Sequence, residues 1–182
     1  WLATMENMSM TVRAYGRTES NGQVALRQPL LRDFHMVGSG YDTGDPWQNL
    51  LVPKTTEGKK AVGGGAKMTY RYYLQDSAFA VLLQIPPNQA LDIAEALQNP
   101  VWDVYLGRKN CVPTELIYQG TYFNDELAWQ RADAMATEKQ RVLSYSVVEG
   151  ELEGEIVTLT DVPTQFGKHK QYRDRQVTLL EH

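Results

Sequence analysis

Residues 68–85 carry the strongest secondary-structure signal in this chain, and the signal is that of β-strands. The even-numbered positions from 68 to 74 hold Met, Tyr, Tyr and Leu. They share one face of an extended chain, because successive side chains of a strand point to opposite faces. Residues 79–85 are almost wholly apolar, which is typical of a buried central strand. We therefore expect a sheet, with Tyr70 and Tyr72 packed on its core.

Weaker patterns place further elements before this segment. Residues 8–14 are rich in Met, Val and Thr and predict a strand, and residues 24–34 predict an extended arm. The stretch 37–67 is long and rich in glycine, and we interpret its three consecutive glycines at 63–65 as a flexible hinge. A loop of this length inside a compact domain is usually functional or disordered.

Two helices and another strand are predicted after the proline pair at 86–87. Asn88 is a good N-cap, and apolar side chains then recur at helical spacing to about Gln98. Residues 116–123 predict a strand, and Asn124 is placed to cap a second helix. Strands and helices therefore alternate in the middle of the chain.

The C-terminal part, residues 140–182, predicts a hairpin followed by a basic arm. Strands at 142–148 and 156–159 are joined by an acidic turn, and a last strand covers 176–180 after the basic arm at 168–175. Helices in the middle and hairpins on either side are typical of an α+β fold with a mostly antiparallel sheet. A ferredoxin-like sheet is compatible with this pattern.

The composition limits the kinds of protein that this chain can be. The chain has 182 residues, 42% of them hydrophobic, which suits a single domain with a real core. Its net charge of −4 argues against a globally basic nucleic-acid binder but leaves room for a local basic groove. One cysteine allows no internal disulfide and fits a reduced, cytoplasmic setting. No apolar run reaches the roughly 18–20 residues that span a membrane.

The residues offer little for catalysis or metal binding. Cys111 has only His35 and His169 as plausible partners and no nucleophile motif around it, so we interpret it as a small buried hydrophobic residue. The acidic run 149–155 lacks the spacing of a calcium loop, and no pair of residues has the spacing of a zinc site. We therefore predict no catalytic residue, no metal and no cofactor.

Residues 105–113 (YLGRKNCVP) do not resemble a generic surface loop. Gly107 allows a turn or a close approach of the backbone, and Arg108 and Lys109 place two positive charges there. Such a site suits a phosphate-rich partner. A tight turn with two solvated charges is the alternative.

The segment 32–71 interleaves cations with aromatic side chains, as proteins that bind single-stranded RNA do. Cations hold phosphates, and aromatic faces stack on unpaired bases at about 1–3 kcal/mol per base. Arg71 has an alternative role, since it could pair with Asp76. The cations are Arg32, Lys54, Lys59, Lys60, Lys67 and Arg71, with His35, and the aromatic residues are Phe34, Tyr41, Trp47, Tyr70, Tyr72 and Tyr73.

Three segments occur in an order that resembles the CasD family, the subunit of the type I-E CRISPR Cascade complex that binds the 5′ handle of the guide RNA. They are residues 31–35 (LRDFH), 68–79 (MTYRYYLQDSAF) and 105–113. The resemblance implies a ferredoxin-like fold of the RAMP superfamily for residues 1–182. It also implies that residues 31–76 form a long hairpin, the thumb, which reaches over the handle and packs on a backbone subunit. A typical member has a further strand and helix before this region, so we expect the N-terminal part to be missing, disordered or cut away.

The resemblance favours a non-catalytic subunit that binds guide RNA and joins the backbone and large subunits of a Cascade complex in antiviral defence. One alternative is a metal-independent ribonuclease, since related subunits of another CRISPR type cut precursor RNA with a Tyr, Lys and His cluster. A second alternative is a protein-interaction module with no RNA role. The predicted RNA-binding residues are Arg32, His35, Lys67, Arg71, Tyr73, Gly107, Arg108 and Lys109, with the basic arm Lys168, Lys170, Arg173 and Arg175 as weaker candidates.

Overall fold

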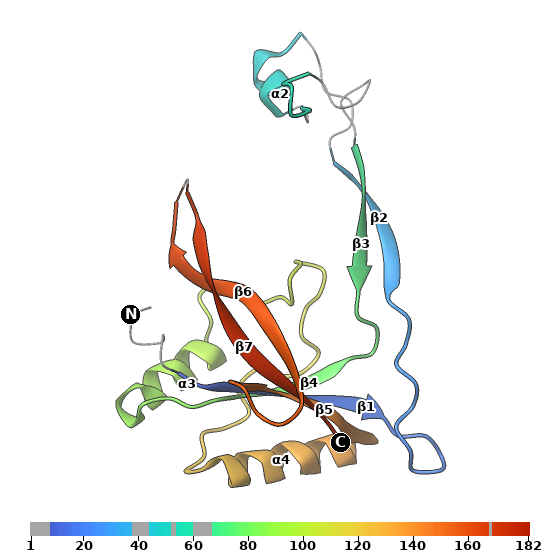
Figure 1. Cartoon of the computed structure of the whole chain (residues 1–182), viewed down its shortest axis with the longest axis vertical. Coiled ribbons are helices and arrows are strands. Elements are labelled where there is room, and N and C mark those ends of the chain that lie inside the picture. The colour runs from blue at the N-terminus through green and yellow to red at the C-terminus, as the bar shows by residue number, and fades with distance from the viewer. Residues whose placement is uncertain (1–7, 38–43, 52–53, 60–66, 168) are drawn as a thin grey trace. The chain divides into compact units, whose positions relative to one another are not determined.

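The chain consists of two compact units in this computed structural model (Figure 1). One unit is Arg27–Ser77, and the other combines Trp1–Leu26 with Ala78–His182. The residues that the structure describes are 8–37, 44–51, 54–59, 67–167 and 169–182.

The larger unit is built on a five-stranded sheet in which every neighbouring pair is antiparallel. The strand order is β4-β1-β5-β7-β6, so β1, β5 and β7 each lie between two neighbours. The predicted α+β fold with an antiparallel sheet is confirmed, and it is compatible with a ferredoxin-like fold. The strands are β1 (Met10–Arg17), β4 (Ala78–Leu83), β5 (Arg141–Glu149), β6 (Glu155–Gln165) and β7 (Gln171–Glu181).

Two helices accompany this sheet, and their N-terminal ends differ in how well they are capped. Asn124 precedes α4 (Asp125–Glu138), and its side-chain oxygen accepts a hydrogen bond of 2.9 Å from the Leu127 amide, as predicted. The cap predicted at Asn88 is wrong. Asn88 lies inside a 3-10 turn, η2 (Pro87–Gln89), and α3 (Ala90–Gln98) follows this turn without a side-chain cap.

The smaller unit contains a two-stranded antiparallel ladder, here called the β2–β3 arm. It consists of β2 (Leu31–Val37) and β3 (Lys67–Tyr73), and a short helix, α2 (Pro46–Leu51), lies between them in the sequence. The hinge predicted at 63–65 lies outside the described residues. Asp76, with φ at 48°, interrupts the extended backbone, so that β3 and β4 are separate strands.

The strand predicted at 79–85 as buried and central is an edge strand. Within the described residues, β4 has one strand partner, β1. Burial alternates along β4, and Phe79, Val81 and Leu83 are exposed. An apolar run alone does not distinguish a strand covered on both faces from one covered on a single face, and here the second face stays open.

The hairpin predicted from 142–148 and 156–159 is also wrong, because β7 lies between β5 and β6. The connection at 150–154 crosses β7 near Thr178 and is tied to it. Thr178, which is 0% exposed, donates to the Gly150 carbonyl and accepts from the Leu152 amide, both at 2.8 Å. This bridging hydroxyl holds the wide turn that leaves room for β7.

The strand predicted at 116–123 is absent, because this stretch has no regular structure in the described chain. Leu116 and Phe123 are exposed, and Gly120 has φ at 142°. β propensity without a neighbouring strand to pair with does not produce a strand.

None of the helices in the described part of the chain is long and apolar enough to cross a membrane.

Candidate nucleic-acid interface

The register of the β2–β3 arm sorts its side chains onto two faces. Directly opposed residues of an antiparallel pair lie on the same face of the sheet, and the face alternates along each strand. Phe34 opposes Tyr70, and His35 opposes Thr69. One face therefore holds Arg32, Phe34, Met36, Met68, Tyr70 and Tyr72, and the other holds Leu31, Asp33, His35, Thr69, Arg71 and Tyr73.

The first face is aromatic and exposed. Tyr70 is 53% exposed and Tyr72 is 61% exposed, so the prediction that these residues pack on the core is wrong. The Arg32 guanidinium lies 5.1 Å from the centre of the Tyr70 ring, a cation–π contact. Aromatic rings next to a cation on an open surface suit stacking with unpaired bases.

The second face is polar and holds most of the contact residues predicted on the arm. His35, Arg71 and Tyr73 lie on it, and the Thr69 hydroxyl donates to the His35 carbonyl at 3.1 Å. Lys67 opposes Val37 at the far end of the ladder, and its side chain lies outside the described residues. Arg32 was predicted with this group but lies on the aromatic face.

His35 and Tyr73 are far apart along the arm. Tyr73 opposes Leu31, which is four residues from His35, so the two positions are separated by roughly 14 Å along the ladder. A general acid and a general base must each be within hydrogen-bond reach of the reacting group. The two residues are therefore not neighbours on this face, because the Asp33–Arg71 pair lies between them.

The turn at 105–113 has defined geometry in the larger unit. Gly107 has φ at 78°, a left-handed conformation that favours glycine. The Leu106 amide donates to the Cys111 carbonyl, and the Cys111 amide donates to the Arg108 carbonyl, both at 2.8 Å. Lys109 is exposed, whereas Arg108 is half-buried and takes part in a contact. Cys111 is only partly buried, so the prediction of a buried thiol is wrong.

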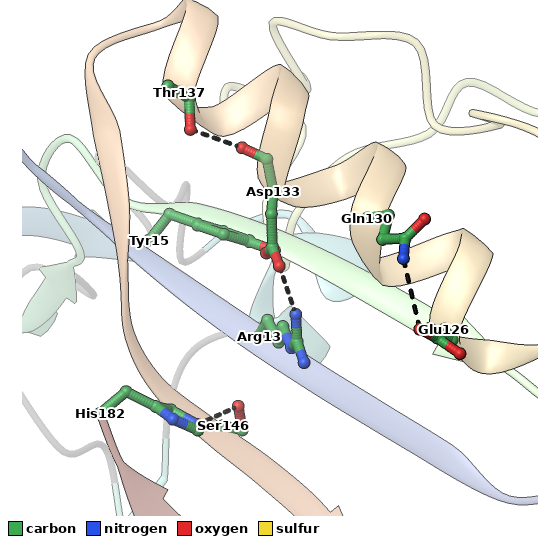
Figure 2. Close-up of polar contacts among 8 residues, drawn as sticks. All are labelled: Arg13, Tyr15, Glu126, Gln130, Asp133, Thr137, Ser146 and His182. Carbon is green, nitrogen blue, oxygen red and sulfur yellow. Dashed lines mark hydrogen bonds and ion pairs between the residues drawn. The ribbon is translucent and has the colours of Figure 1, made fainter.

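A polar cluster beneath α4 joins this helix to β1, and sequence reasoning missed it (Figure 2). Arg13 and Tyr15 donate to the two carboxylate oxygens of Asp133 at 2.7 Å and 2.6 Å. The Arg13 guanidinium also lies 4.3 Å from the centre of the Trp129 ring. Burial, with the hydrogen bond to Asp133, raises the pKa of Tyr15 above its ordinary range. The cluster anchors α4, and no spacing motif could have revealed contacts between residues so far apart in the sequence.

A second polar contact lies near the C-terminus of the chain. The Ser146 hydroxyl and the Nε2 atom of His182 are 2.9 Å apart (Figure 2). This contact shares no residue with the cluster that Asp133 forms with Arg13 and Tyr15. Within the described residues, no group of three or more His, Cys, Asp or Glu side chains could hold a metal ion.

Arg175 of the basic arm is held by carboxylates. Its Nε and a terminal nitrogen lie 2.7 Å and 2.9 Å from the two oxygens of Asp161, and Glu149 lies 3.8 Å away. The hydrogen bond to Asp161 raises the pKa of Arg175, and Arg175 in turn lowers the pKa of Asp161. Arg175 is therefore a poor candidate for a phosphate contact. Lys168 lies outside the described residues.

Comparison with known proteins identifies the family. A family model described as CRISPR-associated protein (Cas_Cas5) matches residues 3–178. No curated protein matches the chain. Proteins of this family work within CRISPR effector complexes. The match extends over both units and nearly the whole sequence, and the chain therefore belongs to the Cas5 family of CRISPR-associated proteins.

Proposed function

We propose that this protein is a non-catalytic subunit that binds the 5′ handle of a guide RNA and joins the backbone and large subunits of a type I-E Cascade complex. The proposal includes a cytoplasmic location. The observation that carries it is the β2–β3 arm, which has an exposed aromatic face with Arg32 and a polar face with His35 and Arg71. The resemblance of residues 31–35, 68–79 and 105–113 to the CasD family supports the finer assignment.

The arm is suited to a single strand because its two faces offer different interactions. Phe34, Tyr70 and Tyr72 present ring faces to which unpaired bases can stack. The His35 and Arg71 face offers polar and cationic groups for phosphates and 2′-hydroxyls. The turn at Gly107, where the backbone is left-handed, adds the exposed Lys109. A net charge of −4 then requires that affinity come from such local groups.

The non-catalytic assignment is supported by the arm geometry. The backbone positions of His35 and Tyr73 are roughly 14 Å apart along the ladder, whereas a general acid and a general base must both reach the same phosphodiester. Residues 106–111 (LGRKNC) also differ from the Leu-Gly-Cys-Arg-Glu type of segment in the cutting relatives.

The test is a salt titration of the chain with a labelled single-stranded 5′ handle, a scrambled RNA and the matching DNA, on gels that also resolve cut products in EDTA. We expect a preference for the intact handle. Arg108→Ala with Lys109→Ala should lower the slope of log affinity against log salt by about 1.4, since each lost phosphate contact contributes about 0.7. Arg131→Gln with Lys139→Gln removes two cations elsewhere and should have little effect.

The other outcomes separate the alternatives. Cut product in EDTA that is lost with His35→Ala would identify a metal-independent ribonuclease. Equal affinity for handle and scrambled RNA would refute handle recognition. Absence of binding to every strand at low salt would favour a protein-interaction module, for which the exposed side chains of Trp47 and Leu50 on α2 are suited.

A further inference from the structure

The β6–β7 hairpin extends well beyond the sheet that carries it (Figure 1). β5 pairs with β7 only as far as the Glu149–Val177 pair, whereas β6 and β7 remain paired out to Gln165 and Gln171. Residues 171–176 therefore lie in a two-stranded ribbon roughly 20 Å long. Residues 163–167 and 169–174 are exposed, so both faces of the ribbon end are open to a ligand.

Charge is unevenly distributed along this hairpin. The acidic residues of 155–181 are Glu155, Asp161, Asp174 and Glu181, and two of them, Asp161 and Asp174, lie at the start of the projecting ribbon. Asp161 holds Arg175, and Asp174 accepts from the Thr160 hydroxyl at 2.6 Å. Residues 162–173 contain no acidic side chain and carry Lys170 and Arg173 as well as His169. Residues 162–173 therefore carry a formal positive charge.

The same end carries two aromatic side chains that no other element covers in the described structure. Phe166 is 65% exposed and Tyr172 is 50% exposed. Gly167, with φ at 103°, allows the chain to reverse directly after Phe166. A hairpin that needed only to reverse direction would have no use for a large apolar ring at the turn. The combination of cations and ring faces on a projecting ribbon is suited to a ligand that offers both phosphates and flat apolar surfaces.

We propose that the end of the β6–β7 hairpin, formed by Phe166, Lys170, Tyr172 and Arg173, is a second binding site for single-stranded nucleic acid. Lys170 and Arg173 bind phosphates, and Phe166 and Tyr172 stack on unpaired bases. A duplex keeps its base faces stacked inside, so a single strand is the better ligand. This site is separate from the β2–β3 arm and from the Gly107 turn. It rests on the proposed function only in that the guide RNA is one nucleic acid that could bind there.

The experiment measures affinity of the full chain for labelled single-stranded RNA, single-stranded DNA and duplex RNA, each of about 12 nucleotides, by fluorescence anisotropy over a range of salt. Phe166→Leu with Tyr172→Leu keeps apolar bulk but removes the ring faces. We expect single-strand affinity to fall roughly five- to 150-fold for each stacked base that is lost. Comparison of the single-stranded RNA with the single-stranded DNA shows which nucleic acid is preferred.

Lys170→Gln with Arg173→Gln tests the phosphate contacts. The salt slope for a single strand should fall by about 1.4, the contribution of two phosphates. Arg131→Gln with Lys139→Gln, which removes the same charge from exposed positions at α4, should leave the slope unchanged. Thermal melting of each variant shows that the fold is retained, and crosslinking of RNA containing 4-thiouridine should attach the strand to the peptide that holds Phe166.

The outcomes also separate this site from the proposed function. If both hairpin variants bind like the wild type while His35→Ala with Arg71→Ala weakens handle binding, the hairpin site is refuted and the arm retains its role. The opposite pattern supports the hairpin site and counts against the arm. Stronger binding of duplex than of single strands, or no crosslink to the hairpin, would also overturn the hairpin site.

Discussion

Asp133 is the residue that joins α4 to the sheet through the largest number of polar contacts described for this helix. Its two carboxylate oxygens serve different donors, Arg13 and Tyr15. Tyr15 is buried, and the side chain of Arg13 is only 21% exposed. Removal of one partner from such a cluster leaves the remaining polar groups without a hydrogen bond in a partly buried place. The loss of stability is then larger than the net contribution of the hydrogen bond itself.

Asp133→Ala is therefore expected to lower the free energy of unfolding by about 1–3 kcal/mol. Glu138→Ala is the matched control, because Glu138 is an exposed carboxylate on the same helix. Urea denaturation followed by circular dichroism measures both. Equal stability of the two variants would show that the cluster contributes nothing beyond the general effect of alanine.

Because of Tyr15, the free energy of unfolding should decrease at alkaline pH. In the unfolded chain its hydroxyl ionises near the ordinary pKa of 10.0, whereas the folded chain holds the proton to higher pH because of burial and Asp133. The stabilisation is therefore complete below the unfolded pKa and is lost as pH rises through the folded pKa. As pH rises above about 10, the wild type should lose stability more steeply than Tyr15→Phe.

Tyr105→Phe is the control for this pH dependence, since Tyr105 is exposed. The unfolding free energy of that variant should follow the wild type at every pH. A Tyr15→Phe curve parallel to that of the wild type would contradict the raised pKa.

At the scale of elements, helix α4 begins with a cap, whereas α3 does not. Asn124→Ala removes the acceptor of the Leu127 amide and should cost about 1 kcal/mol. Asn88→Ala is the control, because Asn88 lies inside the 3-10 turn before α3, and that turn and α3 have no side-chain cap. Chemical denaturation of the two variants is the measurement. A loss of similar size at Asn88 would contradict the 3-10 start of that segment.

The Thr178 hydroxyl of β7 is hydrogen-bonded to the connection between β5 and β6. Thr178→Val keeps the shape of the side chain but leaves the Leu152 amide and the Gly150 carbonyl without this partner. The free energy of unfolding should fall by about 1–3 kcal/mol. Thr158→Val on the exposed side of β6 should be nearly neutral. If Thr178→Val were equally neutral, water would have to satisfy the turn.

At the scale of the whole molecule, the division into two units predicts that the arm can be removed. The Ala25 amide donates to the Arg17 carbonyl, and Ala78 opposes Tyr15. The chain therefore leaves and re-enters the larger unit near positions two residues apart on β1, roughly 7 Å along the strand. Replacement of residues 28–76 by a short Gly-Ser linker should leave a cooperative thermal transition, because the sheet keeps all its strands.

The same excised protein tests where RNA binds. It should lose the preference for the intact 5′ handle and retain the weaker, salt-dependent binding of single strands at the β6–β7 hairpin. Full retention of handle preference would contradict the role of the arm. Loss of the cooperative transition would contradict the division into independent units.

Local pattern was enough to predict the fold class, most strands and the α4 cap. Alternation at 68–74 identified a strand whose two faces differ, and the Asn124 position identified the start of a helix. Three short segments indicated a CRISPR-associated protein, and the match to residues 3–178 confirms this at the level of the Cas5 family. These features depend on residues a few positions apart, where backbone geometry sets the spacing. They are therefore present in the sequence itself.

Tertiary structure alone decided which strands are neighbours and which faces are covered. Alternation predicts that Tyr70 and Tyr72 share a face, but not that the face is open. A run of apolar residues does not reveal that β4 is an edge, and a cluster of cations does not reveal that Asp161 holds Arg175. Pairing, coverage and charge neutralisation depend on residues brought together from distant parts of the chain, so no local pattern records them.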